Sequence, residues 1–161
     1  MFDLDKLKGS SQPVDEYLSS SSQEEPSFAV CSMEYRLDLD VAERLKRYAR
    51  EVVIFAFSAE WCPDCQKIIP VLGLISEATG IEVRIFGHLM RDPMKPRGFW
   101  KIPPSPIEVE EFQVRKIPTI IVIDSSRGIK VGEIIEKPPE GKTLEETLLY
   151  ILETNKCECM R

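Results

Sequence analysis

The sequence predicts an α/β fold: a mixed central sheet of four or five strands with helices on both faces. Two groups of sequence patterns predict it. An apolar stretch at 52–58, a helical pattern ending near residue 80 and an alternating stretch at 81–86 make one βαβ unit. Two further strand-like stretches are separated by a short turn, and a helical pattern follows them. These later elements make a ββα unit, which completes an α/β sandwich.

The βαβ unit is preceded by a helical pattern with a charged opposite face. Its apolar residues recur at helical spacing and are Leu37, Val41, Leu45 and Tyr48. The stretch VVIFAFS, at 52–58, is continuously apolar, which is typical of a strand covered on both faces. Two cysteines come next, and the helical pattern after them ends near Gly80. The 81–86 strand should then run parallel to the 52–58 strand.

The ββα unit is separated from the first by a long polar, proline-rich segment, which we treat as an insertion at about 87–106. A short helix is predicted at 107–113. The stretch TIIVID at 119–124 and the stretch IKVGEII at 129–135 form a predicted hairpin, in which Gly132 indicates a bulge. The run Thr143-Leu144-Glu145-Glu146 has the pattern of a capping box and opens the last helix.

The chain has 161 residues, which favours one main domain. We place this domain at 31–155, with a tail at 156–161. Residues 1–30 are rich in serine, glutamine and acidic residues, so we expect a partly ordered, loosely attached extension. One short helix is possible there, with Ser11 as its cap and Pro13 in its first turn.

Composition narrows the possible functions. Hydrophobic residues make up 43% and the net charge is -6, so nucleic acid and anionic membranes are poor main partners. No run reaches the roughly 18 apolar residues of a membrane span. The start MFDLDKLKGSSQ lacks the apolar region of a secretory signal, so we expect a cytoplasmic protein. In that reducing compartment, cysteine pairs tend to be catalytic or metal-binding, and five cysteines cannot all pair.

The stretch SAEWCPDCQK carries the chemistry. Cys62 should lie at the N-terminus of the helix that follows the 52–58 strand, with Cys65 one turn further. The positive end of the helix favours a thiolate at Cys62, and Pro63 suits a first turn. We expect an exposed outer sulfur at Cys62 to attack a disulfide, and Cys65 beneath it to resolve the mixed disulfide. The pair lies at the carboxyl edge of the sheet, where ligand sites form in open α/β folds.

The motif AEWCPDC, followed by the distant KIPT, resembles the thioredoxin family over about 37–153. The W-C-P-D-C form is similar to a thioredoxin-related subgroup. The resemblance implies a thiol–disulfide oxidoreductase in which Trp61 covers the thiols, the bond before Pro118 is cis and Ile117 offers its backbone to a substrate. It implies no organic cofactor, disulfide-containing proteins as substrates and a reductase fed by NADPH or ferredoxin as electron donor. Pro70 matches the residue at which the family kinks this helix. We further expect a monomer.

Two departures from the family concern carboxylates. Thioredoxins carry a buried aspartate where this chain has Ala56, so the proton-transfer account lacks its usual residue. Asp64 and Glu60 are the nearest candidates, and we expect both to be exposed. The charge of Asp64 opposes a thiolate at Cys62, while the helix dipole favours it. We expect the dipole to dominate and the pair to be reducing.

A third departure is the insertion at about 87–106, which should emerge beside the cysteines. It is basic and aromatic and contains Arg91, Lys95, Arg97, Phe99, Trp100 and Lys101. Either these residues select substrates, or the aromatic ones anchor a long loop whose charges are solvated. His88, in the same segment, is assigned no role.

Other readings of the cysteines stay open. Cys62 and Cys65 could bind zinc together with Cys157 and Cys159, although the second pair has poor spacing for it. Cys157 and Cys159 could also form an accessory dithiol, or lie in a mobile tail. Cys31 is expected to be a small buried apolar residue. As an alternative function, the chain could be a non-catalytic binding or scaffold module with a thioredoxin-like fold.

Overall fold

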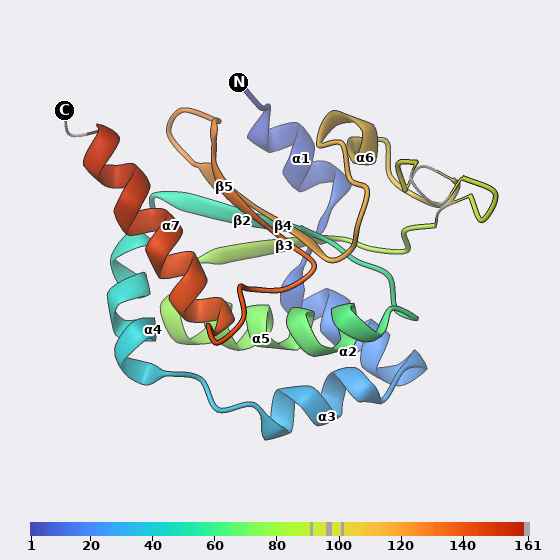
Figure 1. The fold of residues 1–161 in the computed structure, drawn as a ribbon, viewed down its shortest axis with the longest axis horizontal. Helices are drawn as coiled ribbons and strands as arrows, with labels where there is room; N and C mark the ends of the chain where they lie inside the picture. The colour runs from blue at the N-terminus through green and yellow to red at the C-terminus, as the bar shows by residue number, and fades with distance from the viewer. Residues whose placement is uncertain (91, 96–97, 101, 160–161) are drawn as a thin grey trace.

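The computed structural model describes residues 1–90, 92–95, 98–100 and 102–159, with side chains described up to residue 155. Its sheet has five strands in the order β1-β3-β2-β4-β5 (Figure 1). The strands are β1 (Gln12–Pro13), β2 (Val52–Phe57), β3 (Glu82–Phe86), β4 (Thr119–Asp124) and β5 (Lys130–Ile135). The helices are α1 (Leu4–Ser10), α2 (Val14–Glu24), α3 (Ser27–Glu34), α4 (Leu39–Leu45), α5 (Pro63–Thr79), α6 (Glu108–Glu111) and α7 (Leu144–Cys159).

The predicted α/β fold is confirmed. Strand β2 pairs parallel with β3 and antiparallel with β4, and β5 pairs antiparallel with β4. All six residues of β2 are buried, as its continuous apolar sequence predicts. The β4–β5 register shifts between Val122 and Ile123, opposite Gly132, so the predicted bulge is present.

The helices cover both faces of the sheet. In Figure 1, α1 and α6 lie on one side and α5 on the other, where α5 contacts α2, α3, α4 and α7. Gly80 ends α5 with a φ of 77°, a conformation that glycine adopts without strain. The predicted capping box at α7 is also present. The Thr143 amide donates to Glu146 Oε2 at 3.0 Å, and the Glu146 amide donates to Thr143 Oγ1 at 3.1 Å.

The N-terminal segment is packed against the core, whereas we expected a loose attachment. Leu7, Val14, Tyr17 and Phe28 are all buried, and β1 pairs antiparallel with β3. The expected cap at Ser11 is wrong, because α2 begins after Pro13 and the Ser11 hydroxyl donates to the Leu7 carbonyl at 2.7 Å. Only a few apolar residues attach this segment to the core, so its overall composition did not indicate that it is packed. The domain boundary near residue 30 stays a prediction.

Three predicted helices differ in extent. The one predicted at 37–48 is divided into α4 and a 3-10 turn at Lys46–Tyr48, while the one at 107–113 is the single turn α6. Helix α7 continues to Cys159, into the expected tail. Within the described residues, no helix is both long enough and apolar enough to cross a membrane.

Candidate active site

The cysteine pair lies where β2 leads into α5. Cys62 is the N-cap of α5, Pro63 is its first residue, and the Cys65 amide donates to Cys62 Sγ at 3.4 Å. Both thiols are free. The outer sulfur is less accessible than expected, since Cys62 is only 6% exposed and Cys65 is fully buried. The chain that leads into β4 and the loop after β3 meet this edge of the sheet, which accounts for the burial.

The two thiols have opposite acidities. A hydrogen bond from the Cys65 side chain, helped by the backbone amides of Cys65 and Asp64, lowers the pKa of Cys62 to about 7. Burial and the Asp64 carboxylate oppose this change in the Cys62 pKa. Burial, and then the neighbouring Cys62, raise the pKa of Cys65 well above its ordinary value. At neutral pH, Cys62 is therefore partly thiolate and Cys65 stays a thiol.

The distant KIPT segment reaches the pair. The Ile117–Pro118 peptide bond is cis, and the Cys62 thiol lies 3.9 Å from the Ile117 carbonyl oxygen. Both Ile117 and Pro118 are buried, at the start of β4. Because β4 is antiparallel to β2, its first residues lie at the same end of the sheet as the cysteines. This pairing brings together two motifs that are far apart in sequence.

Trp61 is half exposed and stacks on Trp100 from the insertion, with ring centroids 5.6 Å apart. Trp100 itself is buried, and its indole Nε1 donates to the Arg115 carbonyl at 2.9 Å. The Leu89 amide also donates to the Ser58 carbonyl at 3.2 Å. The insertion therefore emerges beside the cysteines, as predicted.

The aromatic residues of the insertion act as anchors in the structure. Besides the Trp100 stack, the Arg115 guanidinium lies 4.9 Å from the centre of the Phe99 ring. Lys95 is exposed. The remaining basic residues, Arg91, Arg97 and Lys101, lie outside the described residues, so their role in substrate selection stays a prediction.

The carboxylates near the pair are arranged differently from our expectation. Ala56 is fully buried, and Asp64 is exposed as expected. Glu60 is mostly buried, so the expectation that it is exposed is wrong. Its Oε1 lies 3.1 Å from His88 Nδ1, beneath the first residues of the insertion. The backbone that leaves β3 covers Glu60, which the local sequence could not indicate.

Two residues beside the pair were not predicted. Tyr17 and Ser58 are fully buried, and Tyr17 Oη lies 2.9 Å from Ser58 Oγ. A hydrogen bond with Ser58 lowers the pKa of Cys65, against the larger effect of burial. Ser58 could have been noticed as a hydroxyl directly after an apolar strand. Tyr17 lies in the serine-rich extension, where no local pattern links it to the cysteines.

The remaining cysteines lie on α3 and α7. Cys31 is half-buried and its thiol donates to the Lys67 carbonyl at 3.2 Å, so the expected burial is wrong. Cys31 lies on α3, which packs on the outer side of α5. In this position the Cys31 side chain stays partly exposed to solvent. Cys157 and Cys159 belong to α7, and their side chains lie beyond those described. The zinc and accessory-dithiol readings therefore stay untested.

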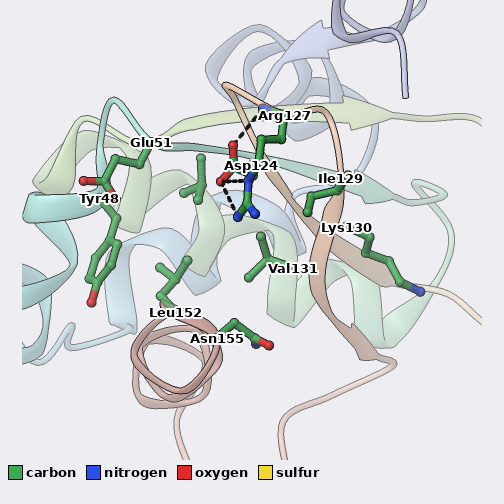
Figure 2. Close-up of a pocket in the computed structure, with 10 residues that line it drawn as sticks. Tyr48, Glu51, Asp124, Arg127, Ile129, Lys130, Val131, Leu152 and Asn155 are labelled. Atoms are coloured by element: carbon green, nitrogen blue, oxygen red, sulfur yellow. Dashed lines mark hydrogen bonds and ion pairs between the residues drawn. The ribbon is translucent and has the colours of Figure 1, made fainter. Parts of the chain in front are cut away.

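A pocket of about 260 Å³ lies at the opposite end of the strands (Figure 2). It is lined by Tyr48, Glu51, Asp124, Arg127 and Asn155, among others. Val52, the first residue of β2, lines it too, whereas Cys62 lies beyond the other end of β2. None of the predicted site residues contributes to this pocket.

Comparisons with known proteins agree with the fold. A protein of unknown function from Pseudomonas aeruginosa has 18% identity and a TM-score of 0.63, over 98% of this chain and 90% of its own. An HIV epitope-scaffold has 17% identity and a TM-score of 0.60, over 94% of both chains. At these identities the likeness shows the fold alone.

Sequence relatives point to one family. Thioredoxin H4 of Arabidopsis thaliana is 26% identical over 91 residues, which are 55% of this chain and 60% of that relative. The match thus spans less than two thirds of the relative's length. The family model described as Thioredoxin matches residues 11–95, which include the cysteine pair but end before Pro118. Because this match covers more than half of the 161 residues, the chain belongs to the thioredoxin family.

Proposed function

We propose that this chain is a thiol–disulfide oxidoreductase that reduces protein disulfides. The observation that carries the proposal is the asymmetry of the pair. The pKa of Cys62 is lowered to about 7 at the helix N-terminus, while the pKa of Cys65 is raised by burial. The Cys62 sulfur is partly ionised and can attack a disulfide. The Cys65 sulfur stays protonated until the mixed disulfide has formed.

The exchange takes two steps. The Cys62 thiolate attacks one sulfur of a substrate disulfide, so a Cys62–substrate bond forms and the other substrate sulfur leaves as a thiolate. Cys65 then loses its proton and attacks Cys62 Sγ, so a Cys62–Cys65 disulfide forms and the second substrate sulfur leaves. Two electrons pass to the substrate, and an upstream reductase returns them.

The neighbouring residues have proposed roles in this exchange. Trp61, half exposed on its Trp100 support, would contact the substrate. Ile117, whose carbonyl faces the Cys62 thiol, and Pro118 would bound the substrate groove. Pro63 and Asp64 would modulate the acidity of Cys62. We also propose a cytoplasmic location and membership of the W-C-P-D-C subgroup.

Insulin reduction by dithiothreitol tests the function. We expect the wild-type chain to accelerate insulin precipitation, and Cys62→Ser to reduce the rate to that of dithiothreitol alone. Cys31→Ser is the matched control, because it removes a thiol on α3 and should keep the wild-type rate. If wild type and Cys62→Ser accelerate precipitation equally, or neither does, the chain is not this enzyme and the binding-module alternative is favoured.

The direction of exchange needs its own measurement. We expect a reducing potential. The Asp64 carboxylate disfavours the Cys62 thiolate, so the reduced form is less stable than in a strongly oxidising protein and gives up its electrons more readily. Equilibration of the pair in glutathione buffers measures it. A potential in the range of oxidases such as DsbA, about -120 mV, would contradict the reductase direction.

A further inference from the structure

Two hydroxyl groups from distant parts of the chain meet next to the inner cysteine. Tyr17 comes from α2, and Ser58 follows the last residue of β2. Tyr17 Oη and Ser58 Oγ are 2.9 Å apart, and both residues are fully buried. Ser58 also interacts with the Cys65 side chain, and this interaction lowers the pKa of the Cys65 thiol. The two hydroxyls therefore lie together beside one of the cysteine sulfurs.

Both hydroxyls are held in place. The Ser58 amide donates to the Phe86 carbonyl at 2.9 Å, and the Ser58 carbonyl accepts from the Leu89 amide at 3.2 Å. The backbone of Ser58 is thus tied to β3 and to the start of the insertion. Its side chain is fully buried as well.

The Tyr17 ring is fixed by its neighbours. It meets the Phe28 ring edge-on, with centroids 6.0 Å apart. On another side, its Cε2 would lie 2.6 Å from a Cβ at Gly87, so only a glycine leaves room for the ring. The titratable groups that face Tyr17 are Glu60, from the loop after β2, and Cys65. Burial and these neighbours raise the pKa of Tyr17, so its hydroxyl stays protonated.

The inner cysteine needs such a partner. Cys65 is fully buried and must become a nucleophile in the second step, yet Ala56 stands where the family resemblance implies a buried aspartate. A hydroxyl can donate to the thiolate as it forms, which lowers the cost of placing a charge there. If Ser58 donates to sulfur, its oxygen is free to accept, and Tyr17 becomes the donor to Ser58. Each hydrogen bond in this order polarises the next.

We propose that Ser58, supported by Tyr17, stabilises the Cys65 thiolate during the resolving step. This inference rests on the proposed function. In that step the Cys65–Cys62 bond forms, the bond between Cys62 and the substrate sulfur breaks, and the substrate leaves as a thiolate. The proton released by Cys65 passes to solvent or to the departing thiolate, and neither hydroxyl is consumed. Ser58 touches the reacting sulfur, and Tyr17 is a positioning residue that acts through Ser58.

The two steps can be separated with the aromatic disulfide Ellman's reagent. In a full-length background with Cys31, Cys157 and Cys159 changed to serine, attack by Cys62 releases one coloured thiolate and resolution by Cys65 releases a second. Stopped-flow absorbance follows both. We expect Ser58→Ala and Tyr17→Phe to keep the first release at its rate and to slow the second by about three- to tenfold. Without the hydroxyl, the fraction of Cys65 present as thiolate falls, which slows resolution. The remaining thiolate is more basic and therefore more nucleophilic, which offsets part of the lost rate.

The pH profile separates this role from a structural one. In both variants, the pH profile of the second-release rate should shift to higher pH. The pH profile of the first-release rate should stay as in the wild type. Tyr35→Phe is the matched control, because its hydroxyl donates to Glu145 Oε2 at 2.7 Å instead, and both releases should stay unchanged. An unchanged second release in a folded Tyr17→Phe or Ser58→Ala would overturn the proposal, as would equal slowing of both releases. Absence of a second release in the background itself would contradict the proposed function, and with it this role.

Discussion

At the scale of single residues, Asp64 acts on Cys62 in two opposite ways. Its backbone amide donates to the sulfur and lowers the pKa of Cys62, while its carboxylate raises that pKa. The amide belongs to the first turn of α5 and is present whatever the side chain. The carboxylate is exposed, so its effect is modest and screened by salt.

We therefore expect Asp64→Asn to lower the pKa of Cys62 below about 7. At mildly acidic pH, alkylation of Cys62 by iodoacetamide should become about threefold faster, and less so at high salt. Mass spectrometry of the cysteine peptides measures the rate across pH. Glu77→Gln, at the other end of the same helix, should leave the profile unchanged. A slower reaction after Asp64→Asn would contradict this assignment.

The residue scale also shows where sequence reasoning stops. Cys62, Cys65 and the distant Ile117-Pro118, which the structure brings together, could be located from motifs, because each lies beside a recognisable strand or helix end. Tyr17 and Ser58 could not be paired, since they are 41 positions apart and no periodicity relates them. Glu60 was misjudged for the same reason: its cover comes from the chain that follows β3.

At the scale of elements, the β4–β5 hairpin is closed by a carboxylate. Asp124 accepts from the Ser126 and Arg127 amides at 2.9 Å each and from the Ser126 hydroxyl at 2.7 Å. Partial burial acts to raise its pKa, but these donors and the Arg127 guanidinium together lower it to about 2. The short turn between the two strands was predicted from the sequence, but the role of Asp124 in it was not.

The sign of the pH dependence follows from that lowered pKa. The Asp124 contribution is present above the ordinary pKa of 3.8 and is lost as the pH falls toward about 2. We expect Asp124→Asn to remove about 1 kcal/mol of stability at neutral pH, since exposure and salt reduce the effect. Urea unfolding from neutral to acidic pH measures it. Glu133→Gln, on the same hairpin, should keep the loss of unfolding free energy that the wild type shows at acidic pH. If Glu133→Gln abolished this acid-dependent loss, the assignment to Asp124 would be contradicted.

At the scale of the whole molecule, the N-terminal segment and the sheet form one packed unit. The Tyr17 ring fills the space above Gly87, and Phe28, Leu7 and Val14 are buried in the same core. Composition predicted a separate extension because serine and acidic residues dominate it. A few large apolar side chains determine the packing instead, and their partners are distant in sequence.

Gly87→Ala tests this unity. The added Cβ would lie 2.6 Å from the buried Tyr17 ring, which Phe28 prevents from moving freely. We expect a loss of about 1–3 kcal/mol, measured as a lower midpoint of urea unfolding. Gly9→Ala is the control: its Cβ would meet nothing within 4 Å, and alanine favours α1. A wild-type midpoint for Gly87→Ala would show that the segment is not packed as described.

The short strand β1 has a consequence for the behaviour of the chain in concentrated solution. It pairs Gln12 with Ile85 and Pro13 with Arg84, and so occupies the outer edge of β3. Arg84 secures it through hydrogen bonds to the Ser11 carbonyl at 2.8 Å and the Lys8 carbonyl at 2.9 Å. Pro13 has no amide hydrogen to offer a further strand. Release of this strand would open β3 to strands from other molecules, so we expect the N-terminal segment also to protect the protein against aggregation.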